Sequence, residues 1–161
     1  ASSGHLPMKR ETIDIGRLLE QTLGEMDEEL CAFGFQLKKD YPLTGMLVLC
    51  DGLHMHRVFQ NLFDNALKYA CPQTRIFIHA IQRSDQFCEI RIRNTSRVPL
   101  DFDPEEITKR FVRGEKARTG EGSGLGLAIA KTYTESCGGQ FHIVIEDDCF
   151  IAVVCLPSIT S

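Results

Sequence analysis

The chain has 161 residues, of which 43% are hydrophobic and 25% charged, a composition typical of one soluble globular domain. Its net charge of −4 gives no electrostatic reason to expect binding to nucleic acid or to an anionic membrane surface. No apolar run approaches the ~20 residues that a membrane-spanning helix requires, so we expect a cytoplasmic chain.

The first part of the chain predicts a linker followed by a long helix. Residues 1–10 are small, polar and turn-forming, and we expect a linker or the end of a preceding helix there. Residues 11–161 are expected to form a single domain. An amphipathic helix is predicted from Asp14 to about Phe33, because leucine and isoleucine recur at helical spacing, and Gly34 is expected to end it.

Two short strands and a second helix are predicted next. The strands cover residues 35–39 and 46–50, around a turn that contains proline. Asp51 is the expected N-cap of a helix that includes 56-HRVFQNLFDNALKYA-70, and Pro72 follows the end of this helix.

The second half of the chain alternates strands with one long polar segment. Residues 95–122 are weakly patterned, and such a long loop in a compact domain is usually functional or disordered. A helix is predicted from about 124 to 136, ended by two glycines. The mixed order of elements predicts an α+β fold, with helices packed on one face of one sheet. The remaining strands are expected over residues 75–81, 87–93, 140–146 and 149–156.

Seven cysteines are scattered along the chain, and none forms a Cys-x-x-Cys motif. Most lie in apolar runs such as 46-MLVLC-50 and 150-FIAVVCL-156, where cysteine acts as a small buried hydrophobe. The pattern argues against a zinc site and indicates a reducing, cytosolic setting. The cysteines are at positions 31, 50, 71, 88, 137, 149 and 155.

The helix after Asp51 carries two asparagines one turn apart, although asparagine is a poor helix former. Asn61, Asn65 and Lys68 lie on one stripe beside the apolar arc. Two amide oxygens placed in this way could hold Mg²⁺ where phosphates supply the charge, and Lys68 could meet a phosphate. The alternative is that both amides are solvated or cap neighbouring backbone. The arc contains Val58, Phe59, Leu62, Phe63, Ala66 and Leu67.

A glycine-rich turn, 120-GEGSGLGLAIAK-131, opens the later apolar helix. Glycine lets the backbone approach a ligand closely, and the exposed N–H groups of a helix start bind phosphate. The turn is neither a P-loop nor a dinucleotide-binding fingerprint, because the flanking residues of both motifs are missing. The alternative is a flexible loop that leads into a core helix.

Together these features resemble the ATP-binding catalytic domain of sensor histidine kinases, in the GHKL superfamily with its Bergerat fold. The resemblance covers about residues 11–157: QNLFDNALKY is similar to the N box of the family, and GSGLGL to its G2 box. It implies a two-layer α/β sandwich, helices on one face of a mixed sheet, and a long lid over ATP. Any anchor in the inner membrane is expected outside this chain.

The resemblance also implies roles for individual residues. Asn61 and Asn65 would coordinate Mg²⁺, Lys68 would reach the phosphates of ATP, and Tyr69 would line the nucleotide site. In 111-FVRG-114, Phe111 would dock on partner helices and Arg113 would approach the γ-phosphate. The resemblance thus implies that Asn61, Lys68 and Arg113 are the catalytic residues. Lys116 and Arg118 would be further lid cations, or parts of a solvated loop. The glycine turn would contact the nucleotide through Gly122, Ser123, Gly124, Leu125, Gly126 and Leu127.

The chain departs from the family in the stretch 94-NTSRV-98. The family has an aspartate that accepts a hydrogen bond from the adenine amino group, followed by two glycines; here Asn94, Ser96 and Val98 occupy these positions. An amide oxygen still accepts this bond, but without charge assistance. Adenine binding is therefore expected to be weaker, or purine specificity relaxed. Thr108 also stands in the place of an aromatic residue of the family.

A second difference concerns the reaction. ATP-hydrolysing relatives carry a glutamate, the general base for water, at the position of Asn61, so steady hydrolysis is disfavoured. The phosphoacceptor histidine of the family lies in a His-Glu/Asp context on a helical hairpin, and none of the histidines here has that context. They are at positions 5, 54, 56, 79 and 142.

The expected function is therefore the catalytic and ATP-binding domain of a two-component sensor histidine kinase. It would bind Mg·ATP and transfer the γ-phosphate to a histidine on a separate dimerisation domain, and a response regulator would receive it. The isolated domain is expected to be monomeric and to bind no nucleic acid. The alternatives are a degenerate nucleotide-binding module that acts through protein contacts, or a GHKL-type ATPase or serine kinase.

Overall fold

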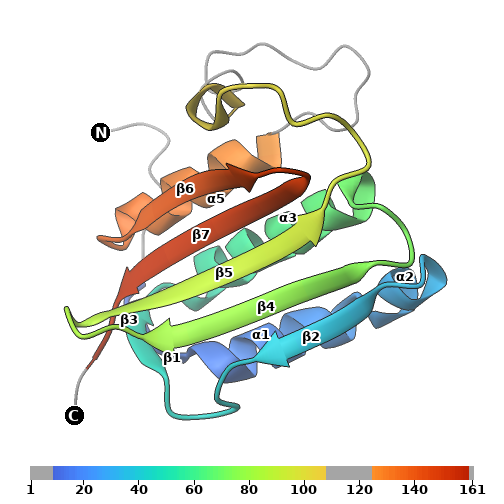
Figure 1. Cartoon of the computed structure of the whole chain (residues 1–161). Helices are drawn as coiled ribbons and strands as arrows, with labels where there is room; N and C mark the ends of the chain where they lie inside the picture. The colour runs from blue at the N-terminus through green and yellow to red at the C-terminus, as the bar shows by residue number, and fades with distance from the viewer. Residues whose placement is uncertain (1–8, 108–124, 160–161) are drawn as a thin grey trace.

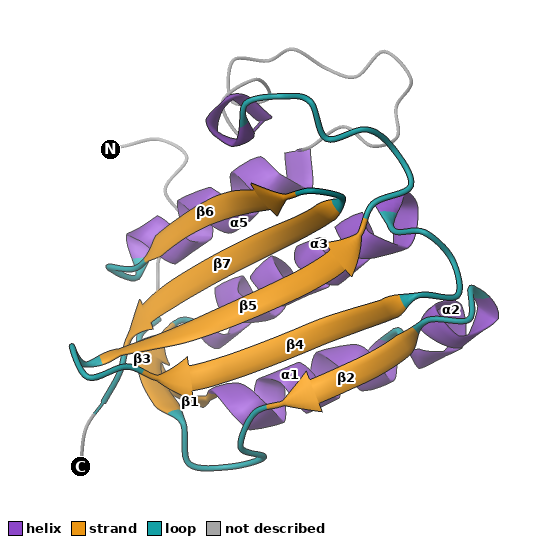
Figure 2. Cartoon of the chain, viewed as in Figure 1, coloured by secondary structure: helices purple, strands orange, loops and turns teal. Residues whose placement is uncertain are grey.

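The computed structural model describes residues 9–107 and 125–159 (Figure 1). A five-stranded sheet of order β2-β4-β5-β7-β6 forms one layer. Helices α1, α3 and α5 cover one of its faces, with α3 between the other two (Figure 2). The α+β fold with helices on one face of a mixed sheet is thus confirmed. The elements are β1 Glu11–Asp14, α1 Ile15–Glu25, α2 Asp27–Ala32, β2 Gln36–Asp40, β3 Leu47–Cys50, α3 Gly52–Tyr69, β4 Arg75–Gln82, β5 Phe87–Thr95, α5 Leu125–Ser136, β6 Gln140–Glu146 and β7 Cys149–Pro157.

Alternation along the strands fixes which face of the sheet meets the helices. On β5, Ile90 and Ile92 are buried while the alternating Arg91 and Arg93 are not, because successive side chains point to opposite faces. β2 pairs in parallel with β4, and the other neighbours in this sheet pair antiparallel. No helix among the described residues is both long and apolar enough to cross a lipid bilayer.

A second, two-stranded sheet was not indicated by the sequence. β1 pairs antiparallel with β3, and Glu11 lies opposite Cys50. β1 has only four residues, too few for a two-residue alternation to be distinguished from chance. The predicted strands 35–39 and 46–50 exist but enter different sheets, since β2 joins the large sheet and β3 the small one.

The helix predicted from Asp14 to Phe33 is two helices, and this prediction is corrected. The backbone leaves helical geometry at Met26, with φ −108° and ψ 11°, so α1 ends at Glu25 and α2 begins at Asp27. The bend turns the chain so that both Met26 and Leu30 are buried. Gly34 ends α2 as predicted, and its φ of +76° is a conformation that favours glycine.

Helix α3 has the predicted cap and the predicted core face. The Oδ1 of Asp51 accepts hydrogen bonds from the backbone N–H of Leu53 at 2.9 Å and of His54 at 3.1 Å, which satisfies two amides that have no partner inside the helix. Its Oδ2 accepts a third bond from Lys9 N at 2.9 Å. The buried residues of α3 are Met55, Val58, Phe59, Leu62, Phe63 and Ala66.

The cysteines do not all behave as the sequence predicted. Cys88 and Cys155 are buried free thiols, and burial raises the pKa of Cys88 to about 11. Cys50 and Cys137, however, form a disulfide with their Cα atoms 5.4 Å apart. The interpretation of the buried cysteines as apolar residues therefore holds for the first two only. Spacing could not reveal the pair, because its members are 87 residues apart.

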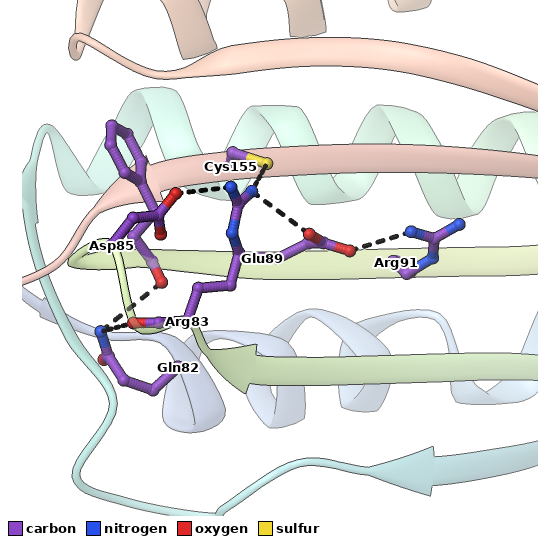
Figure 3. Close-up of polar contacts among 7 residues, drawn as sticks. Gln82, Arg83, Asp85, Glu89, Arg91 and Cys155 are labelled. Carbon is purple, nitrogen blue, oxygen red and sulfur yellow. Dashed lines mark hydrogen bonds and ion pairs between the residues drawn. The ribbon is translucent and has the colours of Figure 1, made fainter.

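The face of the sheet opposite α1, α3 and α5 carries a chain of alternating charges (Figure 3). The Arg83 guanidinium lies 2.6 Å from a carboxylate oxygen of Asp85 and 3.3 Å from one of Glu89, whose other oxygen lies 2.9 Å from Arg91. The Sγ of Cys155 lies 3.4 Å from Arg83. Glu89 and Arg91 stand opposite Cys155 and Val153 of β7, two members of the small apolar cluster formed by Ile151, Val153 and Cys155.

A hollow of about 450 Å³ also lies on this opposite face. Phe77, His79 and Arg93 are among its lining residues, and the Arg93 guanidinium lies 5.8 Å from the centre of the Phe77 ring. No residue of α3 or α5 lines the hollow, so it is separate from the asparagine stripe.

Replacing Asp51 is expected to weaken the start of α3. The change Asp51→Ala removes the cap and should lower the free energy of unfolding by about 1–2 kcal/mol in urea titrations at neutral pH. Asp51→Asn keeps an acceptor oxygen and should cost less. Equal stability of Asp51→Ala and the unaltered chain would contradict a stabilising cap.

The same variants test the charge of this carboxyl group. Burial acts to raise the pKa of Asp51, but hydrogen bonds from Lys9, His54 and Leu53 and the charge of His54 outweigh it, so the pKa lies below its ordinary value. The stabilisation is then complete above the ordinary pKa of about 4 and is lost as the pH falls through the folded-state value. Asp51→Asn should remove this part of the acid dependence.

Candidate functional site

The site is built where α3 and α5 pack against each other in opposite directions. Near the start of α3, the His54 ring stacks on Tyr133 close to the end of α5, with ring centres 4.1 Å apart. In the middle of α3, the Asn61 side-chain amide donates to the carbonyl of Gly126 in the first turn of α5, at 3.4 Å. The predicted N-box asparagine thus lies directly beside the predicted glycine turn.

The predicted polar stripe of α3 is present. Asn61 and Asn65 are half-buried, and Lys68 is exposed. The bond to Gly126 uses the amide nitrogen of Asn61, so its Oδ1 is the atom suited to bind a cation. This bond is also the backbone contact that the alternative interpretation of the asparagines predicted, and it is compatible with a role for the oxygen.

Lys68 forms an exposed ion pair with an acidic side chain on the same helix. Its Nζ lies 3.3 Å from Oδ2 of Asp64, one turn earlier on the same helix. Both side chains are about half exposed, and ion pairs of this kind contribute little to stability. Lys68 can therefore exchange this partner for a more highly charged one, such as a phosphate, at small cost.

The segment 94–98 is fastened to the end of α3. Ala70 and Ser96 form a β-bridge, and Cys71 N donates to the carbonyl of Thr95 at 2.8 Å. Arg97 N donates to the carbonyl of Tyr69 at 2.9 Å, and the Arg97 guanidinium donates to the carbonyl of Lys68. These bonds bring the segment 94–98 next to two residues of the N box.

Arg97 is a residue of this site that the sequence analysis missed. Its guanidinium lies at the carboxyl end of α3, where carbonyl groups lack helical partners and the helix dipole favours a cation. The position of Arg97 inside the stretch 94-NTSRV-98 was a signal in the sequence. Only the tertiary structure shows which helix end this arginine meets.

The residues that replace the two glycines of the family in the segment 94–98 are accommodated by ordinary backbone. Neither Ser96 nor Val98 has a positive φ, so neither position requires glycine. The Ser96 hydroxyl donates to Val98 O at 2.9 Å and accepts from Val98 N at 3.1 Å, which closes the turn. Asn94 is only 3% exposed and shares the helix-facing side of β5 with Ile90 and Ile92.

The first turn of α5 approaches Asn61 so closely that a larger side chain at Gly126 would press on the Asn61 side chain. A Cβ atom at Gly126 would lie 3.3 Å from both Cβ and Cγ of Asn61. Leu127 is 2% exposed and belongs to the core, and Leu125 begins the helix. The other predicted residues lie in 108–124, outside the described residues, and their roles stay predictions: Phe111, Arg113, Lys116, Arg118, Gly122, Ser123 and Gly124.

Comparison with known proteins agrees with this arrangement. Residues 50–158 match the model of the family described as histidine kinase-, DNA gyrase B-, and HSP90-like ATPase. The match covers α3, the segment 94–98 and α5, and the chain belongs to this family of ATP-binding domains. The resemblance drawn from the N and G2 boxes is thereby confirmed.

Curated relatives include two sensory kinases. The adaptive-response sensory kinase SasA of Synechococcus elongatus is 32% identical over 130 residues, which cover 80% of this chain and 33% of the relative. The sensor histidine kinase HprS of Escherichia coli is 24% identical over 156 residues, which cover 93% of this chain and 32% of the relative. The chain thus spans about a third of the length of these relatives.

Solved structures share the fold. The nucleotide-free catalytic domain of histidine kinase ThkA superposes with a TM-score of 0.80 at 18% identity, over 93% of this chain and 96% of that one. The mycobacterial sensor histidine kinase MprB superposes with a TM-score of 0.76 at 21% identity, over 95% of this chain and 100% of that one. The Bergerat-type sandwich is confirmed by this likeness.

The close approach of Gly126 to Asn61 yields a test that separates site geometry from stability. In Gly126→Ala the new methyl group should displace the Asn61 amide by a few tenths of an ångström and lower Mg²⁺-dependent nucleotide affinity severalfold in calorimetry. Thermal stability should not fall, because alanine is the better helix former by about 1 kcal/mol.

Gly24→Ala is the matched control, because a Cβ at Gly24 in α1 would meet nothing within 4 Å. It should share the gain in helix propensity and leave nucleotide affinity unchanged. If both variants bind nucleotide like the unaltered chain, the contact between Asn61 and Gly126 has no part in the site.

Proposed function

We propose that this chain is the catalytic and ATP-binding domain of a two-component sensor histidine kinase. It binds Mg·ATP and transfers the γ-phosphate to a histidine on a separate dimerisation domain, from which a response regulator takes it. The observation that carries the proposal is the convergence of the asparagine stripe, the start of α5 and the segment 94–98 around one half of α3.

Phosphoryl transfer requires mainly positioning and charge neutralisation, and the residues of this site supply both. The amide oxygens of Asn61 and Asn65 are suitable Mg²⁺ ligands, because the phosphates of ATP contribute the negative charge. Lys68 is proposed to provide a point charge for the phosphates, and Tyr69 and Asn94 are proposed to line the nucleotide. Arg113, outside the described residues, is proposed to meet the γ-phosphate. Mg²⁺ itself would shield the charge on the phosphate oxygens.

The choice of a kinase over an ATPase depends on the acidic groups near the stripe. The position of the hydrolytic glutamate is taken by Asn61, whose amide is not a base. The nearby Asp64 carboxylate forms an ion pair with Lys68 at 3.3 Å. Without a carboxylate aimed at water, the chain is proposed to hold ATP with little turnover until a phosphoacceptor arrives.

The phosphoacceptor is proposed to come from outside the chain, because three of the described histidines have other partners and none of the five lies in the His-Glu/Asp context of the family. His54 stacks on Tyr133, and His56 lies 2.8 Å from a carboxylate oxygen of Glu25 on α1. His79 lies 3.5 Å from Asp40, on the opposite face of the sheet. The pairing of His56 joins α3 to α1, which is a structural role.

The second candidate function is a degenerate module that acts through protein contacts. Asn94 in place of the family's aspartate favours it. The regular backbone at Ser96 and Val98 argues against it, since the loss of the two glycines has not distorted the segment.

Calorimetric titration of ADP and ATP, with and without Mg²⁺, tests the proposal. The unaltered chain should bind in the micromolar range with Mg²⁺, and Asn65→Ala should bind at least about tenfold more weakly, because an oxygen ligand of the metal is lost. Gln21→Ala, which removes an exposed amide from α1, is the control and should bind normally. No binding at millimolar nucleotide would favour the degenerate module, and steady ATP consumption without a partner would favour an ATPase.

The identity of residue 94 should set the preference for adenine. Asn94→Asp restores a charged acceptor, and because hydrogen bonds to charged groups are stronger by about 1 kcal/mol, affinity for ATP should rise severalfold relative to GTP. Without nucleotide, the loss of stability of this variant relative to the unaltered chain should be larger at neutral pH than at acid pH, since a buried carboxylate has a raised pKa. An unchanged ratio of ATP to GTP affinity would place the adenine elsewhere.

A further inference from the structure

The Cys50–Cys137 disulfide joins the two helices of the site at the end remote from Asn61. Cys50 is the last residue of β3 and directly precedes Asp51, the N-cap of α3. Cys137 directly follows α5. The bond therefore links the start of α3 to the end of α5, whereas Asn61 meets the start of α5 through Gly126. Both cysteines are almost fully buried, at 0% and 2% exposure.

We propose that Cys50 and Cys137 form a reversible thiol–disulfide site whose redox state sets how α5 is held against Asn61, and thereby tunes nucleotide affinity. The effect on nucleotide rests on the function proposed above. A disulfide in a cytosolic protein is usually a transient or redox-sensing one, so its presence between the two helices of an ATP site calls for a role of this kind.

Reduction changes the space that the two sulfurs need. Bonded sulfurs lie about 2.05 Å apart, whereas heavy atoms that are not bonded stay about 3.5–4.0 Å apart. The surroundings offer little room: a Cβ on Gly139 would overlap the carbonyl oxygen of Cys155 on β7, so the chain just after Cys137 is already pressed against the sheet. Close-packed interiors resist compression, and we infer that the end of α5 moves instead.

The movement reaches the site because α5 is a single helix of 12 residues between Cys137 and the turn at Gly126. The hydrogen bond from Asn61 to Gly126 is long, at 3.4 Å, and hydrogen bonds weaken steeply beyond ordinary distances. A small displacement of the first turn therefore releases the Asn61 amide. The oxidised state keeps this contact and holds Asn61 in place, which favours nucleotide binding through pre-organisation.

The oxidant that converts the two thiols to the disulfide is a low-molecular-weight disulfide such as oxidised glutathione, which is itself reduced. The thiolate of one cysteine attacks a sulfur of the oxidant and expels one glutathione, which forms a mixed disulfide. The second cysteine displaces the other glutathione, so two protons and two electrons leave the protein with two molecules of reduced glutathione. Because both thiols are buried, the exchange requires local opening of the end of α5.

The test uses the whole chain with the exposed and half-exposed thiols removed by Cys31→Ser, Cys71→Ser and Cys149→Ser. After oxidation by oxidised glutathione or reduction by dithiothreitol, alkylation and intact mass count the free thiols, and calorimetry measures ADP affinity. Reduction should expose two more thiols and weaken ADP binding between about twofold and tenfold, the range for losing one hydrogen bond. Re-oxidation should restore the affinity.

Cys137→Ala and, separately, Cys50→Ala supply the control, since alanine is small and apolar and each change removes the bond. Both variants should bind ADP like the reduced chain and show no redox dependence. Equal affinity of the oxidised and reduced chains, or two thiols that alkylate equally after either treatment, would overturn the proposal.

A readout without nucleotide separates this inference from the proposed function. The side-chain amide signals of Asn61 in nitrogen-15 NMR, assigned with Asn61→Gln, report the Gly126 contact directly. They should shift on reduction in the unaltered chain and stay fixed in Cys137→Ala. A redox-dependent shift without any ADP binding would remove the proposed function and keep the redox site, whereas ADP binding without a shift would remove the redox coupling alone.

Discussion

The packing of α3 between α1, α5 and the large sheet is the constraint on which the rest of the structure depends. Six residues of one face are buried, including Phe59 and Phe63, which are 0% exposed and among the largest buried side chains. Burial of each such ring contributes roughly 1.5–3 kcal/mol. Because this face is committed to the core, the neighbouring stripe with Asn61, Asn65 and Lys68 has to lie at the edge of the sandwich, half in contact with solvent.

Both ends of α3 are held by chain segments that are distant in sequence. At the start, the Asp51 cap receives a bond from Lys9, and the Cys50–Cys137 disulfide joins the end of α5. At the other end, Arg97 and the bridge between Ala70 and Ser96 attach the segment after β5. A helix held at both ends presents its side chains in one register, which is what recognition of a metal–nucleotide complex requires.

The charged groups of the molecule are divided between the two faces of the sheet. On the helix side, Lys68 has only a weak, solvent-exposed pairing with Asp64 and can accept a phosphate. On the opposite side, the Glu89 carboxylate pairs with both Arg83 and Arg91, next to a small apolar cluster of the sheet (Figure 3). Among the described residues, Lys68 is therefore a cation that could exchange its partner for an anionic ligand, although the net charge of the chain is −4.

The sequence by itself determined the order of elements from β2 onward, the buried face of α3, its Asp51 cap and the membership of the chain in its family. These properties depend on local spacing and on motifs of a few residues, which a linear reading preserves. Only the tertiary structure decided that Gly126 touches Asn61, that Arg97 caps α3, that Cys50 meets Cys137 and that the first helix breaks at Met26. The physical reason is that each of these depends on how distant segments pack together, and no local period or motif encodes the resulting distances.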